Sequence, residues 1–360
     1  MYNKNELAIL YLDKLELSYK KFGELLSSLE SASEIFEKKG QDKLSLFAKP
    51  SAVEFLTRHS YEQIEEYVTK DLEKFNIFAV TICSSAYPEI LKNISDPPYV
   101  LYTIGDISLL SRQKIGVVGT RKITTYGRDV ANKFTRELSQ AGLVTVSGLS
   151  YGVDTCCAKS TLEAGGKTIA VLAGGLDNIY PADNLALSQK IAKTGLLVSE
   201  YRPFVRPKQY SFLARNRIIS GLSDGVLVVE AGRHSGATST ANFAIEQGRE
   251  LFVVPGNINS PQSEGTNDLI NEMPDCFTIS TSQILTRLGV QTQTDQKTKT
   301  VQLDFFSQQI VDYLKNGEAH FDSICAALAV NASELSSALT MLEIMGVVNK
   351  NAGNYYSLAM

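Results

Sequence analysis

Three glycine-containing loops follow short apolar runs in the middle of this sequence, and their residue types suit the binding of an anion. Their sequences are Gly119-Thr120-Arg121, Ser147-Gly148-Leu149-Ser150 and Gly174-Gly175-Leu176-Asp177. Glycine lets a backbone approach a ligand closely, and the free N–H groups at the start of a following helix attract negative charge. Loops that follow neighbouring parallel strands share one edge of a sheet, so the three loops predict a phosphate site there.

A segment at 201–217 combines cations with aromatic rings and contains no acidic residue. Its sequence is YRPFVRPKQYSFLARNR, and it includes Arg202 and Phe212. Cations that follow a phosphate backbone, together with rings that stack on bases, are typical of a groove for single-stranded nucleic acid. A solvated basic loop with core aromatics is the alternative, which composition alone leaves open.

Two arginines near the end of this segment are predicted to point in different directions. A helix from about residue 209 places Arg215 on its apolar face and Arg217 on the opposite face. An inward arginine needs an anion, which is either a ligand phosphate or an internal carboxylate such as that of Glu200 or Glu230. Both alternatives remain open at this point.

A further loop, with the sequence EAGRHSGATS at 230–239, resembles another anion-binding turn at the start of a helix. Its candidate ligand-binding residues are Ser235 and Gly236. A serine at this position also serves as an ordinary helix cap, which is its commoner use.

The residues that would mark an enzyme are scattered or absent. The three histidines, His59, His234 and His320, fall in three different regions and suggest neither a metal site nor a catalytic triad. Cys156-Cys157 lies within a predicted helix, where buried inert thiols are usual. A Walker motif and a G-x-G-x-x-G fingerprint at the first strand are both missing. We therefore expect no enzyme activity, no metal and no cofactor.

The elements that must position these loops alternate between strand and helix. The apolar runs are Ile115–Val118, Leu143–Val146, Thr168–Leu172, Leu196–Val198, Val226–Val229 and Leu251–Val254. Continuous apolar runs are typical of parallel strands buried on both faces. Their alternation with helices predicts an α/β domain at 75–286 with a doubly wound parallel sheet.

The flanking regions have different patterns. Residues 1–74 carry apolar residues at helical spacing, and we predict an N-terminal helical domain. Prolines 88, 97 and 98 indicate a connecting region before the first apolar run. The polar stretch at 287–302 predicts a linker. Three helical patterns and a hairpin around Asn351-Ala352-Gly353 predict a winged-helix domain at 303–360.

Composition limits the class of protein. A chain of 360 residues with 44% hydrophobic residues is long enough for two or three domains with a substantial core. No apolar stretch is long enough to span a membrane, and five cysteines without a spacing framework favour reduced thiols and a cytoplasmic location. A net charge of −4 argues against a protein coated in nucleic acid, but a local basic groove remains possible.

Six ordered stretches of the sequence resemble the DNA-processing-protein-A family (DprA, also called Smf). They are VVGTRKITTYG at 117–127, SGLSYGVD at 147–154, TIAVLAGGLDNIYPADN at 168–184, SEYRP at 199–203, FLARNRIISGLSDGVLVVEAGRHSG at 212–236 and AIEQGRELFVVPGNI at 244–258. The resemblance implies that the N-terminal helical domain is SAM-like and that the central domain is Rossmann-like. It implies a homodimer that binds single-stranded DNA through this Rossmann-like domain. It also implies help in loading the RecA recombinase during natural transformation, without catalytic turnover.

The family's DNA-binding positions carry over to particular residues of this chain. The resemblance places Arg121 and the pair Ser147-Gly148 on DNA phosphates, and it aligns the family's RNR block with Arg215, Asn216 and Arg217. Three positions depart from the family pattern. Ala182 stands where a lysine is frequent, Leu15-Glu16-Leu17 replaces a glycine-containing hairpin, and Glu272-Met273-Pro274 interrupts a stretch that resembles the dimer edge.

The charge of the C-terminal domain argues against duplex binding. From Leu303 onward the sequence has two cations, Lys315 and Lys350, against six carboxylates. The third predicted helix, which would enter a major groove in a DNA-binding relative, contains no lysine or arginine. We expect this domain to bind protein or nothing.

Two other functions are alternatives to the binding of single-stranded DNA. A hydrolase resembling the lysine-decarboxylase-like phosphoribohydrolases would hold a nucleoside monophosphate in the glycine loops and use Glu200 or Glu230. Such enzymes usually carry a Pro-Gly-Gly-x-Gly-Thr loop, whereas this chain has AGGLDN at 173–178. A protein-interaction scaffold, in which the loops are purely structural, is the third possibility.

Overall fold

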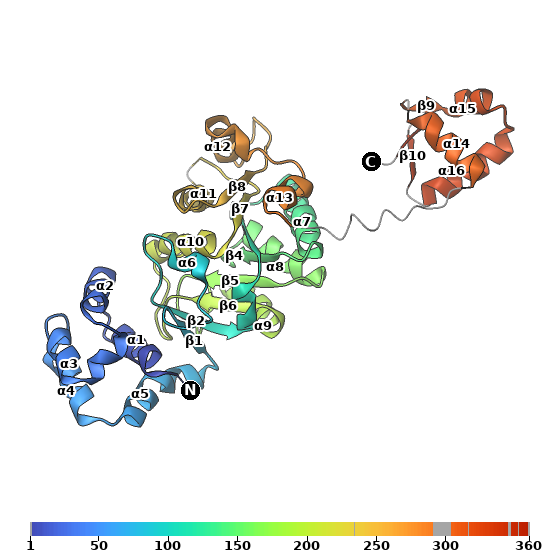
Figure 1. Cartoon of the computed structure of the whole chain (residues 1–360). Helices are drawn as coiled ribbons and strands as arrows, with labels where there is room; N and C mark the ends of the chain where they lie inside the picture. The colour runs from blue at the N-terminus through green and yellow to red at the C-terminus, as the bar shows by residue number, and fades with distance from the viewer. Residues whose placement is uncertain are drawn as a thin grey trace. The chain divides into compact units, whose positions relative to one another are not determined.

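The computed structural model divides the chain into two compact units, Met1–Gln291 and Thr292–Met360 (Figure 1). The structure describes residues 2–233, 235–290, 304–315, 317–344, 347–351 and 353–358. The predicted linker therefore falls mostly outside the described residues, and its first residue, Arg287, is the last residue of helix α13.

The first unit is built on an eight-stranded sheet with the order β1-β2-β6-β5-β4-β3-β7-β8. The strands are β1 (Phe78–Thr81), β2 (Val100–Gly105), β3 (Lys114–Val118), β4 (Val144–Ser147), β5 (Thr168–Leu172), β6 (Leu196–Ser199), β7 (Gly225–Val228) and β8 (Glu250–Val253). Strands β3 to β8 are mutually parallel, whereas β1 and β2 are antiparallel additions at one edge. All six predicted strands are confirmed, but β1 and β2 lie in the region interpreted as a connection.

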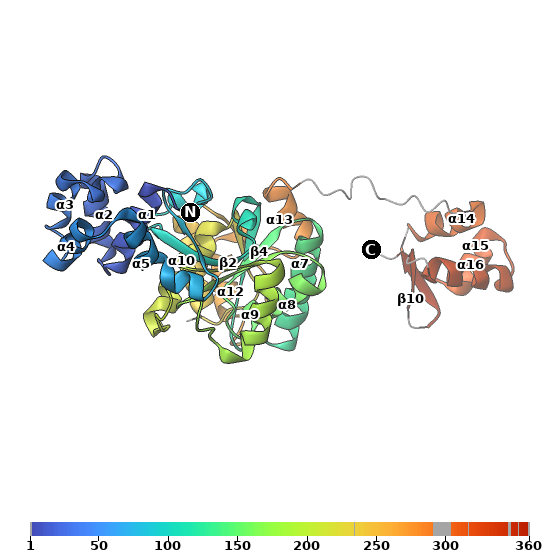
Figure 2. The ribbon, with the colours of Figure 1, turned by 90° about the horizontal axis from the view of Figure 1, so that it is seen from below.

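Helices cover both faces of this sheet. One face carries α7 (Thr125–Gln140), α8 (Val153–Glu163), α9 (Leu185–Thr194) and α13 (Thr281–Arg287), and the other carries α6 (Glu89–Lys92), α10 (Gln209–Leu222) and α11 (Gly236–Glu246). Figure 2 shows α7, α8 and α9 side by side. Ile115 and Val117 of β3 pack with Phe134 of α7, whereas Val118 packs with Ile219 of α10. The alternation of side chains along each strand thus fills two separate cores.

The N-terminal helices pack against the antiparallel edge of the sheet. They are α1 (Lys4–Lys14), α2 (Tyr19–Ser28), η1 (Ala32–Phe36), α3 (Lys38–Leu44), α4 (Pro50–Arg58) and α5 (Tyr61–Lys74). Leu7 and Ile9 belong to one hydrophobic cluster with Ala79 of β1 and Tyr102 of β2. The hydroxyl of Tyr102 also donates to the carboxylate of Asp13 at 2.6 Å. The domain boundary at residue 74 and the SAM-like classification stay predictions.

The second unit contains three helices and a small sheet. The elements are α14 (Phe305–Leu314), β9 (Ala319–His320), α15 (Phe321–Leu328), α16 (Ala332–Ile344), β10 (Val348–Asn351) and β11 (Tyr355–Leu358). The predicted helices and the hairpin are confirmed, and β9 adds a third strand in the order β10-β11-β9. Ile310, Ile324, Leu339 and Tyr356 join the helices and the sheet in one core.

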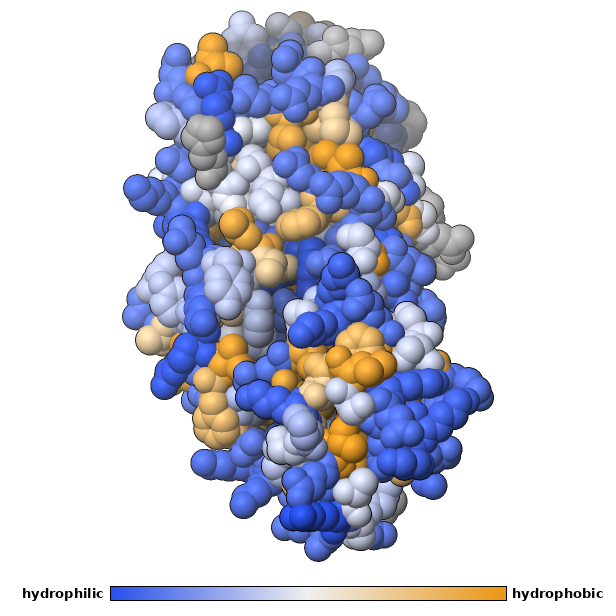
Figure 3. All heavy atoms as spheres, turned by 90° about the vertical axis from the view of Figure 1, so that its left-hand side faces the viewer, coloured by the Kyte–Doolittle hydropathy of each residue, from blue (hydrophilic) through white to orange (hydrophobic). Residues whose placement is uncertain are grey.

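The surface in Figure 3 is largely hydrophilic, with its hydrophobic residues in small separate groups. No single helix of the described ranges is both long and apolar enough to cross a membrane.

Two remaining helical elements, α12 (Glu264–Glu272) and η4 (Pro274–Cys276), follow β8. The 3-10 segments η2 (Ile107–Ser111) and η3 (Ala182–Asn184) precede β3 and α9.

The order of the parallel strands fixes where a ligand can bind. Strand β3 pairs with β4 on one side and with β7 on the other, so the chain connections diverge between β3 and β7. In an open parallel sheet, this switch point leaves a crevice beyond the carboxyl ends of the two strands. The loops after β3 and β7 are therefore expected to form the walls of a binding site.

Candidate nucleic-acid interface

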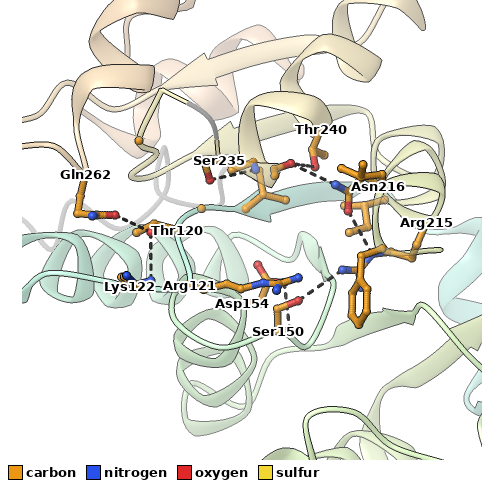
Figure 4. A pocket seen from close by; sticks show the side chains of 18 of the residues that line it. Thr120, Arg121, Lys122, Ser150, Asp154, Arg215, Asn216, Ser235, Thr240 and Gln262 are labelled. Atoms are coloured by element: carbon orange, nitrogen blue, oxygen red, sulfur yellow. Dashed lines mark hydrogen bonds between the residues drawn. The ribbon is translucent and has the colours of Figure 1, made fainter. Parts of the chain in front are cut away.

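A crevice of about 580 Å³ lies at this switch point. Its lining includes Gly119, Thr120, Arg121 and Lys122 after β3, Ser150 and Asp154 after β4, Gly232, Arg233, Ser235 and Gly236 after β7, and Gln209, Phe212, Arg215 and Asn216 of α10. Figure 4 shows Thr120, Arg121 and Ser150 on one side and Ser235, Asn216 and Thr240 on the other. Polar groups from loops that are distant in sequence therefore converge on one cavity.

The loop after β3 is fixed by its backbone and by Thr120. The Thr120 N–H donates to the Glu230 carbonyl at 2.6 Å, and the Thr120 hydroxyl donates to Gln262 Oε1 at 2.8 Å. A Cβ atom at Gly119 would lie 2.4 Å from Val153, so only glycine fits at this strand end. These contacts hold the turn from which Arg121 projects.

Arg121 is the exposed cation at the mouth of the crevice. Its guanidinium carbon lies 5.2 Å from the centre of the Phe212 ring, within the range of a cation–π contact. Neither Arg121 nor its neighbour Lys122 forms an ion pair with any described residue. Both positive charges therefore remain free to meet an anion.

The opposite wall is the N-terminus of α11. The Ser235 hydroxyl accepts the Ala237 N–H at 3.2 Å, so Ser235 does act as the helix cap. The Gly236 carbonyl accepts from the Asn216 side chain at 3.1 Å, which ties α11 to α10. The start of this helix faces the crevice and contributes a partial positive charge there. His234 lies outside the described residues.

Arg215 binds the fold itself, through backbone carbonyls. Its guanidinium is buried and donates to the carbonyls of Gly148 at 2.7 Å and Val171 at 2.5 Å. The predicted partners Glu200 and Glu230 are therefore wrong, because the ends of β4 and β5 supply the acceptors. Sequence periodicity placed the side chain inward, but it carries no information about backbone carbonyls.

Asp154 supplies the nearby negative charge. Its carboxylate accepts the N–H groups of Gly148 at 3.1 Å and Ser150 at 3.2 Å. Burial raises the pKa of Asp154, and the charge of Arg215 opposes this effect. Burial also lowers the pKa of Arg215 to about 10, again opposed by the charge of its partner. Arg215 thus stays protonated near neutral pH and fastens the second loop to α10.

The third glycine loop is not part of this crevice, which corrects the predicted cradle of three loops. A Cβ atom at Gly174 would lie 2.9 Å from Pro207, and the Gly175 N–H donates to the Val205 carbonyl at 2.8 Å. In the second loop, a Cβ atom at Gly148 would lie 2.3 Å from Arg215. The glycines of both loops are thus required by internal packing, and the loop after β7 completes the crevice instead.

Two predicted cations lie elsewhere and are neutralised within the protein. Arg202 forms an ion pair with Glu16 of the N-terminal region. Arg217 forms ion pairs with Glu200 at 2.6 Å and with Asp96 at 2.7 Å. Arg217 does point away from Arg215, as the helical spacing predicts, but it reaches an internal carboxylate rather than the crevice.

The predicted site residues therefore fall into two groups. Those that line the crevice are Gly119, Thr120, Arg121, Phe212, Arg215, Asn216, Ser235 and Gly236. Those outside its lining are Ser147, Gly148, Gly174, Gly175, Arg202 and Arg217. Whether any of them touches nucleic acid stays a prediction.

Several lining residues were not among those predicted from the sequence. Lys122 directly follows Arg121 and Arg233 lies two residues before Ser235, and their charge was the available signal. Gln209 begins α10 and carries no charge. Gln262 enters from the loop after β8, far along the chain from Thr120, so only the folded topology brings the two together.

The carboxylates that might catalyse a reaction are occupied by internal partners. Glu230 accepts from the Thr124 N–H at 3.0 Å and from the Thr124 hydroxyl at 2.7 Å, which fixes the start of α7. Glu200 is paired with Arg217. Within the described ranges, no group of histidine, cysteine and acidic residues is arranged to hold a metal ion.

An open, mostly parallel sheet with helices on both faces and a crevice at its switch point defines a Rossmann-like α/β protein. The sequence profile described as "DNA recombination-mediator protein A" matches residues 78–289, and that of the "DprA winged helix domain" matches residues 296–354. The chain therefore belongs to the DprA/Smf family of DNA-processing recombination mediators. The predicted family and the α/β fold are confirmed, and the hydrolase alternative is not favoured.

Two relatives that are similar in sequence support this membership. "DNA processing protein DprA" of Bacillus subtilis is 47% identical over 197 residues, a match that covers 54% of this chain and 66% of that protein. The Streptococcus pneumoniae protein of the same name is 41% identical over 213 residues, covering 59% of this chain and 74% of that protein. The matched region is thus about two thirds or more of these relatives.

Two solved structures share the fold. The X-ray structure of DNA processing protein A from Streptococcus pneumoniae has a TM-score of 0.67 at 32% identity and covers 79% of this chain and 98% of that chain. The structure of the Helicobacter pylori protein, whose subject is a single-stranded DNA binding mode, has a TM-score of 0.54 at 34% identity. It covers 59% of this chain and 95% of that chain.

Proposed function

We propose that this chain binds single-stranded DNA in the crevice between β3 and β7 and acts as a recombination mediator through that binding. The main supporting observation is the pairing of an exposed Arg121 with the Phe212 ring, opposite the N-terminus of α11. A cation and a helix start hold phosphates, and an adjacent ring stacks on a base. The named binding mode of the Helicobacter pylori relative supports the same ligand class.

The electrostatics of the crevice favour an anionic ligand. Arg121 and Lys122, which have no ion-pair partner among the described residues, bring two cations to one wall. Arg233 adds a third cation, which is shared with Asp268 at 2.9 Å. The nearby carboxylates of Asp154 and Glu230 accept internal hydrogen bonds. The positive charge is therefore local, which agrees with a net charge of −4 over the whole chain.

The test compares single-stranded with duplex DNA of equal length, using fluorescence anisotropy and the full-length protein. A lost charge-assisted contact weakens binding by roughly tenfold or more, so Arg121→Ala should lose at least that much affinity for the single strand. Arg112→Ala is the matched control, because Arg112 donates to the Gly142 carbonyl near the opposite ends of the strands. Equal losses in the two variants, or tighter binding of the duplex, would contradict the proposal.

We also propose a homodimer formed through the Rossmann-like domain. Large apolar residues lie exposed around α12 and η4, beside the edge strand β8: Ile258, Met273, Phe277 and Ile279. Exposed apolar residues grouped on one side favour association. Light scattering should report a dimer for the native chain and a monomer for Phe277→Asp, and a dimer in both would refute this edge.

The remaining functional expectations are proposals of the same kind. RecA recombinase is the expected partner, tested by mixing the two proteins with and without single-stranded DNA. A cytoplasmic location is tested by fractionation. The absence of turnover is tested by incubation with AMP, where release of ribose 5-phosphate would revive a hydrolase.

A further inference from the structure

The third loop continues from its glycines to residue 184, just before α9, and carries an aromatic ring near the crevice. Tyr180 is half exposed, and the centre of its ring lies 5.5 Å from that of Phe212 with the planes at 65°. This loop brings no cation of its own, because residue 182 is alanine and residues 177 and 183 are aspartates. Its chemistry therefore suits a base rather than a phosphate.

A second tyrosine continues from this ring. Tyr151 follows Ser150 of the crevice wall and is also nearly half exposed. Its hydroxyl donates to Asp183 Oδ2 at 2.9 Å, which fastens the ring to the third loop. That hydrogen bond is the main cause of the raised pKa of Tyr151, and Tyr180 is close enough to contribute to the same shift.

Phe212, Tyr180 and Tyr151 form a set that we name the aromatic row. The three rings come from α10, the third loop and the second loop, and Arg121 lies over the first of them. Single exposed aromatics are common on protein surfaces and need no explanation. A half-buried ring in a crevice that attracts phosphates, followed by two exposed rings, matches the arrangement by which proteins stack unpaired bases.

We propose that the DNA strand leaves the crevice over the third loop and stacks successive bases on Phe212, Tyr180 and Tyr151. This proposal rests on the proposed function, since it extends the same binding site. Asp183, which accepts from Tyr151, repels the phosphates, so the bases face the protein here and the backbone faces solvent.

The other possible path runs along the basic segment that precedes Phe212. Tyr210 is the most exposed ring of that segment, and Lys208 Nζ lies 5.9 Å from its centre. The earlier part of this segment already contacts the N-terminal helices. Arg202 forms an ion pair with Glu16, and the ring centres of Phe204 and Phe75 lie 5.4 Å apart. The contacts therefore favour the third loop as the path.

The experiment measures the affinity of full-length variants for oligothymidylates of increasing length, from the dinucleotide upward. Tyr180→Leu should weaken binding of the longer oligonucleotides by about fivefold or more, because loss of one stacked base has an effect of that size. Short oligonucleotides that fill only the crevice should bind Tyr180→Leu and the native chain equally. Tyr180→Phe, which keeps the ring, should bind every length like the native chain and serves as the folding control.

Tyr210→Leu and Arg121→Ala separate the possible failures. If Arg121→Ala binds like the native chain, the proposed function itself fails. If Arg121→Ala is weakened but Tyr180→Leu is not at any length, the aromatic row is refuted and the crevice stands. A loss in Tyr210→Leu without a loss in Tyr180→Leu would also overturn the row and would direct the strand along the basic segment.

Discussion

Replacement of Arg215 by methionine should destabilise the fold, whereas loss of Arg121 should not. The methionine keeps most of the volume of the side chain but removes the donors to the Gly148 and Val171 carbonyls. It also leaves the buried carboxylate of Asp154 without its positive partner. A buried acceptor left without its donor costs about 1–3 kcal/mol, so loss of the two carbonyl contacts should lower the free energy of unfolding by about 2–6 kcal/mol.

The assay is urea unfolding followed by far-ultraviolet circular dichroism, since the sequence contains no tryptophan to report on the core. Arg121 is exposed, and Arg121→Ala should change the free energy of unfolding by less than about 0.5 kcal/mol. Asp154→Asn added to Arg215→Met should recover part of the loss, because it removes the uncompensated charge.

Loss of Arg215 should therefore lower the stability of the fold, and loss of Arg121 should lower the affinity for DNA. An Arg215→Met variant as stable as the native chain, yet unable to bind DNA, would refute the structural role of Arg215. It would mean that the guanidinium serves the ligand rather than the ends of β4 and β5. A destabilised variant without recovery by Asp154→Asn would show that the carbonyl contacts alone carry the effect.

Three further predictions follow from particular contacts. Gly148→Ala should destabilise by about 1–3 kcal/mol in urea unfolding, because its methyl group meets the anchored Arg215, whereas Gly236→Ala enters open space and should be stable. Burial raises the pKa of the Cys157 thiol to about 12, so mass spectrometry should find Cys157 unalkylated by iodoacetamide at pH 8, while the exposed Cys83 is modified. Lys350→Ala should leave duplex affinity unchanged in anisotropy titrations, because α16 carries no cation and the C-terminal domain is acidic; a clear loss would assign duplex binding to that domain.

The central fold could be predicted because its signals are strong and local. Apolar runs such as Thr168–Leu172 are buried on both faces, and the helices between them have clear ends. Strands β1 and β2 were missed because the prolines around them resemble a connection. Their place in the sheet comes from pairing with each other and with β6, which no local pattern reveals.

The candidate site could be predicted only in part. Phe212 was identified by the composition of its segment, and Arg121 by its glycine loop and the family resemblance; both line the crevice. Arg202 has the same charge but pairs with Glu16, which is distant in the sequence. Arg217 pairs with Glu200 and Asp96, which belong to other parts of the fold. Charge and spacing therefore select candidate residues, but only the fold decides which cations are available to a ligand and which pair with internal carboxylates.

The most direct test of the crevice as a phosphate site is the salt dependence of single-stranded DNA binding. The logarithm of the affinity falls linearly with the logarithm of the salt concentration, with a slope set by the number of phosphates contacted. If Arg121 holds one phosphate, Arg121→Ala should make that slope shallower by about 0.7 while Arg112→Ala leaves it unchanged. An Arg121→Ala slope equal to that of the native chain would contradict the account.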